Sequence, residues 1–144
     1  MAVSYTVPLL SLTWFTFWAL LLVLNVGRLR VTQVMAGKAK PDSFPSGVKH
    51  GTDAEWRANR AQANTVENLP IFATLVLIGV ASGVAMGTFA TLCLVVAVAR
   101  PIQSIIHISS GSANAVNMRF GAFIVQLICF VWMAVILLLH FYGM

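Results

Sequence analysis

Residues 57–79 read RANRAQANTVENLPIFATLVLIG, and this stretch combines a polar half with an apolar half. The polar half carries residues at steps of three, four, three and one, which place them on one stripe of a helix: Arg57, Arg60, Asn64, Glu67 and Asn68. The apolar half, after Pro70, has no charged residue. Ionisable groups that reach into a bilayer face protein or a water-filled cavity and are candidates for function. The stretch therefore predicts a membrane helix with a polar stripe at one end.

The whole chain has the composition of a membrane protein. Of its 144 residues, 59% are hydrophobic and 9% are charged, whereas a soluble domain has about 25% charged residues. This balance excludes a soluble enzyme, a disordered chain and, despite the net charge of +5, a nucleic-acid binder. Runs near the 20 residues that cross a bilayer predict a single domain over residues 1–144 with spans at about 7–27, 57–80, 88–108 and 118–141. We therefore expect an all-α membrane protein, a four-transmembrane-helix bundle.

The charges lie on one side of this expected bundle. All nine Lys and Arg and all four Asp and Glu fall between Arg28 and Arg119. With four spans, the polar loop 28–56 and the connection before Arg119 share one side, and the positive-inside rule places that side in the cytoplasm. We predict an integral multi-pass protein with both termini outside and the charged loops in the cytoplasm. Because the first run lacks a basic start, we expect a span rather than a cleaved signal peptide.

A second polar stripe, formed by Arg100, Gln103 and His107, lies on the third span at steps of three and four. The second span runs outward and the third inward, so Glu67 is the expected partner of Arg100. His107 is open to two interpretations, as a catalytic base or as a hydrogen-bonding residue at the interface. The three histidines and the two cysteines lack the spacing of metal ligands, so the sequence predicts no metal site.

Together the two stripes predict a wet, cationic cavity that opens to the cytoplasm. Arginines at the ends of neighbouring spans, Arg28, Arg30 and Arg119, complete a ring of positive charge around it. Arginines at span ends also serve as anchors at the membrane interface, and for Arg30 this interpretation is equally open. Guanidinium groups bind carboxylates bidentately, and a carboxylate such as that of Glu67 accepts from an ammonium group. Nearby positive charge also favours a thiolate over a thiol. The cavity therefore suits a small, anionic, peptide-like ligand.

The run Arg57-x-x-Arg60-Ala61-Gln62-x-Asn64-x-x-Glu67-Asn68-x-Pro70-x-Phe72 closely resembles the signature of the MAPEG family, the membrane-associated proteins in eicosanoid and glutathione metabolism. Gly27-Arg28-Leu29-Arg30 resembles the family's arginine cluster at the end of the first span, and Arg100 resembles the arginine of its third span. The resemblance implies a homotrimer with glutathione bound between neighbouring protomers on the cytoplasmic side. It implies that glutathione contacts Arg28, Arg60, Asn64, Glu67 and Arg100, and that Arg119 stabilises its thiolate. From the same stripes we add Arg57, Asn68 and Gln103 to the expected contacts.

Two departures from the family pattern leave two hypotheses open. Gln103 and His107 stand where family enzymes usually carry tyrosine, or histidine and tyrosine. The connection from Arg100 to Arg119 looks about one helical turn longer than the family's, so Asn114 could instead occupy the place of the catalytic arginine. The first hypothesis is a glutathione transferase or peroxidase that conjugates glutathione to an apolar small-molecule electrophile from the lipid bilayer. The alternative is a non-catalytic accessory or structural subunit of a larger membrane complex.

Overall fold

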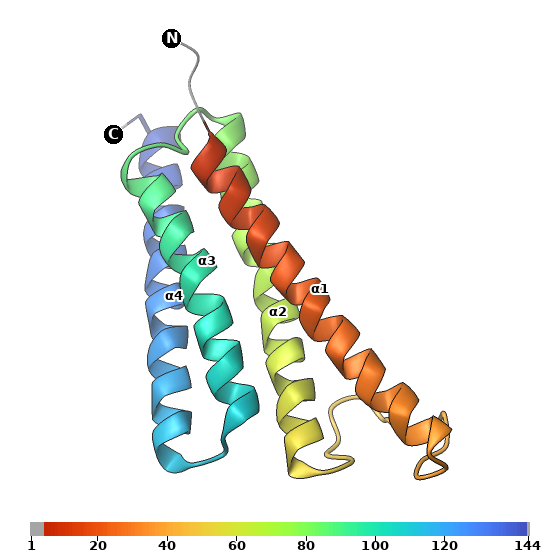
Figure 1. Ribbon diagram of the computed structural model, residues 1–144. Helices are drawn as coiled ribbons and strands as arrows, with labels where there is room; N and C mark the ends of the chain where they lie inside the picture. The colour runs from red at the N-terminus through yellow and green to blue at the C-terminus, as the bar shows by residue number, and fades with distance from the viewer. Residues whose placement is uncertain (1–4, 144) are drawn as a thin grey trace.

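A computed structural model describes residues 5–143 as four antiparallel helices. They are α1 (Thr6–Met35), α2 (Asp53–Ala81), α3 (Thr88–Ser109) and α4 (Ala113–Phe141). Each helix is long and apolar enough to cross a membrane. The start of α1 and the end of α4 lie at one end of the bundle, and the loops 36–52 and 110–112 lie at the other (Figure 1). The expected all-α, multi-pass membrane bundle is thereby confirmed.

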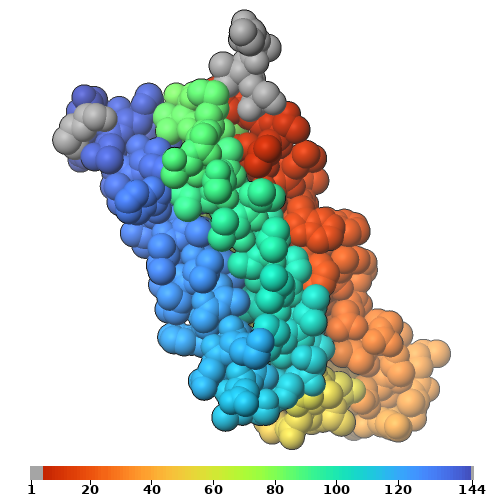
Figure 2. All heavy atoms as spheres, turned by 60° about the vertical axis from the view of Figure 1, so that its left-hand side comes forward, coloured from red at the N-terminus to blue at the C-terminus, as the bar shows by residue number. Residues whose placement is uncertain are grey.

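The two middle helices hold the bundle together. Each of α2 and α3 contacts the other three helices, whereas α1 and α4 make no contact with each other within residues 5–143. On the face shown in Figure 2, α3 lies between α4 and α1. The side chains packed between the helices are aromatic, aliphatic and thiol groups, among them Phe15, Phe72, Phe89, Cys93 and Met133. Many large apolar side chains on all four helices remain exposed, as expected of a surface in contact with lipid.

The first helix continues eight residues beyond residue 27, into the segment 28–56 that the sequence predicts as a loop. Its end is determined by Gly37, whose φ of +68° is a left-handed conformation that glycine adopts without strain. The amides of Gly37 and Lys38 donate to the carbonyls of Val34 and Gln33, both at 3.0 Å, and so satisfy the last turn. The end of the apolar run shows where the helix leaves the lipid. The helix itself continues until a termination signal, here Gly37, ends it. The loop therefore covers residues 36–52.

Two other helices start before their apolar runs because polar side chains cap them. Thr52 accepts from the Glu55 amide at 3.3 Å, and Glu55 accepts from the Thr52 amide at 2.8 Å, which starts α2 four residues before residue 57. The Ser112 hydroxyl accepts from the Ala115 amide at 3.3 Å and starts α4 five residues before residue 118. Both caps lie at the charged end of the bundle.

Candidate functional site

A polar cleft opens between α2, α3 and α4 at the charged end of the bundle. It consists of two adjoining hollows of about 470 and 340 Å³ that share His107, Val116 and Arg119. The hollow nearer the helix ends is also lined by Arg57 and Arg60, and the deeper one also by Asn64, Gln103, Asn117, Phe120 and Phe123. The structure therefore brings together polar residues of three helices that the sequence places on separate stripes.

Arginines give this cleft an excess of positive charge. Arg57 Nε donates to the Ile108 carbonyl at 3.2 Å and so ties α2 to the end of α3. Arg60 and Arg119 make no hydrogen bond and no ion pair within residues 5–143. The carboxylate at the rim, that of Asp53, lies 2.6 Å from Lys49 Nζ. Two guanidinium groups are therefore available to an anionic ligand.

A chain of side-chain hydrogen bonds closes the inner end of the cleft. Arg100, which is fully buried, donates from Nη1 to Asn64 Oδ1 at 2.8 Å, and Gln103 Nε2 lies 3.4 Å from the same oxygen. Gln126 Nε2 in turn donates to Gln103 Oε1 at 3.0 Å. Since a guanidinium can only donate, the oxygen of Asn64 must face Arg100. Asn64 therefore has its amide nitrogen left to donate to a ligand in the cleft.

The expected pairing of Arg100 with Glu67 is wrong for this protomer. Arg100 instead has its guanidinium carbon 5.2 Å from the centre of the Phe15 ring, and its Nε and Nη2 have no hydrogen-bond partner within residues 5–143. Glu67 is exposed and lines a different hollow, together with Arg60 on its own helix and Arg30 on α1. Residues at steps of three and four lie within a broad sector of a helix. Only part of this polar sector of α2 contacts α3. Asn64 lies in that part and Glu67 outside it.

Two other expected ligand contacts lie away from the cleft. Arg28 is exposed on α1, where its Nη2 donates to Asn25 Oδ1 at 3.2 Å. Asn68 is buried, and its amide nitrogen donates to the Asn64 carbonyl at 2.7 Å, inside its own helix. Within one protomer the cleft therefore gathers six of the ten residues predicted for the site: Arg57, Arg60, Asn64, Gln103, His107 and Arg119.

The two positions considered for the catalytic arginine lie in different places. Arg119 lines both hollows, whereas Asn114 is exposed at the start of α4 and lines neither. Gln126 was missed by the sequence reasoning, although a glutamine in the middle of an apolar span is expected to face the interior of a bundle. No group of three or more His, Cys, Asp or Glu side chains that could hold a metal ion occurs in the described part of the chain.

Comparison with known proteins identifies the family. The family model of the MAPEG family matches residues 8–139, a range that contains every residue lining the cleft. A search of curated proteins and a search of solved structures each gave no match. Membership supports a glutathione-transferase-like or related membrane function in general. Because the match extends over nearly all of its 144 residues, this four-helix membrane protein belongs to the MAPEG family.

Proposed function

We propose that this protein is a membrane glutathione transferase or peroxidase that binds glutathione in the cleft between α2, α3 and α4. The observation that carries the proposal is the pair of guanidinium groups of Arg60 and Arg119, which have no partner within residues 5–143 and share a cleft whose rim carboxylate already faces Lys49. Glutathione is a tripeptide with two carboxylates, and arginine binds carboxylates bidentately. The free amide nitrogen of Asn64 adds a donor for a peptide carbonyl.

Within this site Arg119 acts on the thiol of glutathione. A nearby guanidinium favours the thiolate, which is the nucleophilic form of sulfur. His107 lines the same two hollows and is placed to accept the proton that the thiol loses. The sulfur then forms a bond to an electrophilic carbon, and the leaving group departs with its electron pair. The apolar second substrate reaches the cleft from the lipid, near Phe120 and Phe123.

A homotrimer would complete the site. Arg28 and Glu67 are exposed and lie outside the cleft of their own protomer. Charged groups at the depth of a membrane helix face protein or water, so a second copy packed against the outer face of α2 would give Glu67 a protein environment. In that assembly Glu67 is proposed to accept from the ammonium group of glutathione, and Arg28 to bind a carboxylate. Native mass spectrometry in a mild detergent should report trimers, and a population of mainly monomers or dimers contradicts the proposed assembly.

The proposed orientation places the loop 36–52 in the cytoplasm and the end of α4 outside. Ser46 and Tyr142 are exposed at opposite ends of the bundle, and the native Cys93 and Cys129 are buried. We expect Ser46→Cys to react with a membrane-impermeant thiol reagent only from the cytoplasmic side and Tyr142→Cys only from the outside. The reverse labelling pattern contradicts this orientation.

A second function, that of a non-catalytic accessory or structural subunit, is favoured by Gln103. This residue stands where family enzymes usually carry tyrosine, and its two polar ends already face Asn64 and Gln126. Its amide is therefore committed to the protein rather than to the reacting thiol. The two functions differ in whether glutathione in the cleft is converted to its thiolate.

One experiment separates these two functions. The protein in detergent is titrated with glutathione and with S-methylglutathione, and thermal stabilisation, thiolate absorbance and conjugation of a reactive aryl halide are measured. A transferase is stabilised by both peptides and produces thiolate and conjugate with glutathione. Stabilisation by both peptides without thiolate supports the accessory subunit. Absence of stabilisation by either peptide contradicts glutathione binding and therefore the transferase.

A further inference from the structure

A second cavity, of about 230 Å³, lies beneath the loop 36–52, between the last turns of α1 and the first turns of α2. None of its lining residues lines the cleft between α2, α3 and α4. Its polar lining includes Arg30, Lys38, His50 and Glu55. The cavity is therefore separate from the cleft between α2, α3 and α4. It adjoins the hollow that Glu67 lines, with which it shares Arg30 and Asn59.

The walls of this cavity are held in place by specific contacts. The Gln33 amide donates to Glu55 Oε1, which joins α1 to α2, and Glu55 Oε2 accepts from the Thr52 amide at 2.8 Å. The ring of His50 packs edge-on against Phe44, with centroids 5.6 Å apart, and against Trp56 at 5.9 Å. These contacts fix the loop over the cavity and engage both oxygens of the Glu55 carboxylate.

Two cations in the same lining remain without an anionic partner. Arg30 has its guanidinium carbon 5.5 Å from the centre of the Phe44 ring, and its buried Nε has no hydrogen-bond partner within residues 5–143. Lys38 forms no ion pair in that part of the chain. A buried donor without a partner is costly to a protein, so an acceptor at Arg30 would be stabilising. The cavity therefore suits an anion.

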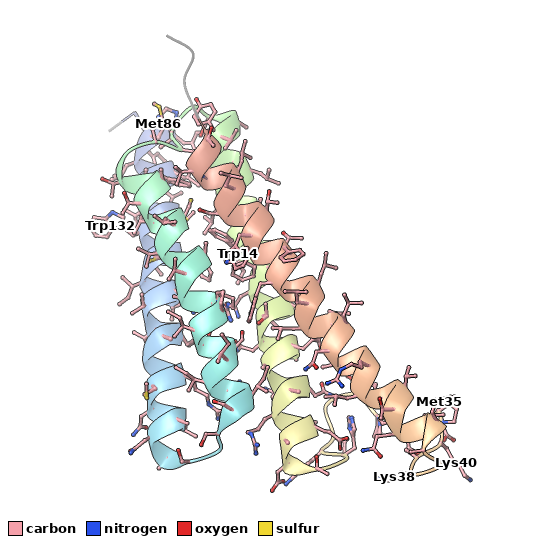
Figure 3. The ribbon with its side chains drawn as sticks, in the orientation of Figure 1. Trp14, Met35, Lys38, Lys40, Met86 and Trp132 are labelled. Atoms are coloured by element: carbon pink, nitrogen blue, oxygen red, sulfur yellow. The ribbon has the colours of Figure 1, made fainter. Side chains whose placement is uncertain are left out.

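Arg30 and Phe44 also line a neighbouring groove that contains no residue of α2. This groove is lined by Arg30, Phe44 and four apolar residues: Val31, Val34, Met35 and Pro41. The apolar run of α1 ends at Val26, and Arg30 follows about 6 Å farther along the helix axis, where lipid headgroups begin. Figure 3 shows Met35, Lys38 and Lys40 together at this end of α1, at the opposite end of the molecule from Met86.

We infer that this cavity binds the phosphate of an anionic phospholipid headgroup, with the lipid's apolar part along the groove beside Val31 and Met35. Arginine binds phosphate through paired hydrogen bonds, and basic pockets at the ends of transmembrane helices bind anionic headgroups. The volume is below the roughly 300–1,000 Å³ of pockets for drug-sized ligands, which fits a headgroup alone. The lipid would enter through the groove, whose lining includes the apolar α1 residues Val31, Val34 and Met35.

The test is native mass spectrometry of the full chain in detergent, titrated with phosphatidylglycerol and, separately, with phosphatidylcholine. We expect tighter binding of phosphatidylglycerol. Arg30→Gln and Lys38→Gln should each weaken it about fivefold, the effect of one basic residue near an anionic headgroup. Lys40→Gln is the matched control, because Lys40 is exposed on the same loop and lines neither the cavity nor the groove. We expect it to change binding less than twofold.

Three outcomes would overturn the inference. Equal binding of the two lipids removes the role of the anionic headgroup. Equal losses in Lys38→Gln and Lys40→Gln show general surface attraction instead of a site. Displacement of phosphatidylglycerol by millimolar inorganic phosphate assigns the cavity to a soluble anion. If Arg30→Gln fails to fold, the exposed Lys38 still permits the comparison with Lys40.

Discussion

Two groups of polar residues differ in what surrounds their arginines. The buried group, on α2, α3 and α4, consists of Arg100 and the side chains linked to it, Asn64, Gln103 and Gln126, and the open group consists of Arg60 on α2 and Arg119 on α4. Arg100 is fully buried, donates to Asn64 and lies over the Phe15 ring. Arg60 is exposed and Arg119 half-buried, and neither has a partner within residues 5–143. A buried guanidinium needs its protein acceptor, whereas an exposed one is free to bind a ligand. Burial thus distinguishes residues that hold the helices together from residues that are free to bind a ligand.

The largest effect is expected from removing the free guanidinium of Arg119. If this group stabilises the thiolate, Arg119→Ala should lower turnover by about 10²–10³-fold, as the loss of one donor to a developing anion typically does. The KM for glutathione should change much less, because the contact strengthens after binding. Steady-state conjugation of an aryl halide measures both quantities. Asn114→Ala is the control with unchanged turnover, and full turnover in Arg119→Ala contradicts the role of this arginine.

A smaller effect, on stability, is expected from the buried group. Asn64→Leu removes the acceptor of Arg100 and should lower the free energy of unfolding by about 1.5–3 kcal/mol, the usual value of a hydrogen bond to a charged group. In an Arg100→Met background the same substitution should cost less, since no guanidinium is then left unpaired. Denaturant unfolding in detergent, followed by circular dichroism, measures the four variants of this cycle. Strictly additive losses would show that the two residues are not coupled.

Arg60→Gln tests the open group, because it is expected to weaken ligand binding without lowering stability. Because Arg60 is exposed and lacks a partner within residues 5–143, its removal should change the free energy of unfolding by less than about 0.5 kcal/mol. Its removal should raise the KM for glutathione about tenfold, through the loss of one charge-assisted contact. Glu67→Gln should likewise weaken binding without destabilising the protomer, since Glu67 does not pair with Arg100. A large loss of stability in either variant places that residue with the buried group.

The smallest effect is expected at Gln126, a fully buried residue at the end of the hydrogen-bond chain that runs through Asn64 and Gln103. Gln126→Leu removes its hydrogen bond to Gln103 and should lower the free energy of unfolding by about 1 kcal/mol. The amide of Gln103 then becomes free to turn toward the cleft, so the KM for glutathione should change as well. Unfolding and kinetic measurements on the same preparation test both effects. An unchanged KM would show that Gln103 takes its orientation from Asn64 alone.

Several features of this protein are determined by the sequence alone because they depend on local properties of the chain. Run length and composition determine four membrane helices, and the positions of Lys and Arg determine which end of the bundle is charged. The motif from Arg57 to Phe72 was sufficient to indicate the family that the match over residues 8–139 establishes. Helical spacing also placed Arg60 and Asn64 on one stripe, and both line the cleft.

Other features were decided by the tertiary structure, because they depend on where another helix lies. Spacing defines a sector of a helix but not the edge of its contact with a neighbour, so Glu67 shares a stripe with Asn64 yet lies outside the cleft. The partner of Arg100 and the contribution of Gln126 arise from the packing of α2 and α4 against α3. The cavity beneath residues 36–52 exists because α1 continues to Met35 and carries Arg30 and Gln33 toward α2. The sequence contains all of these polar residues. Only their arrangement in space shows that Arg100 is buried between helices while Arg60 and Arg119 line an open cleft.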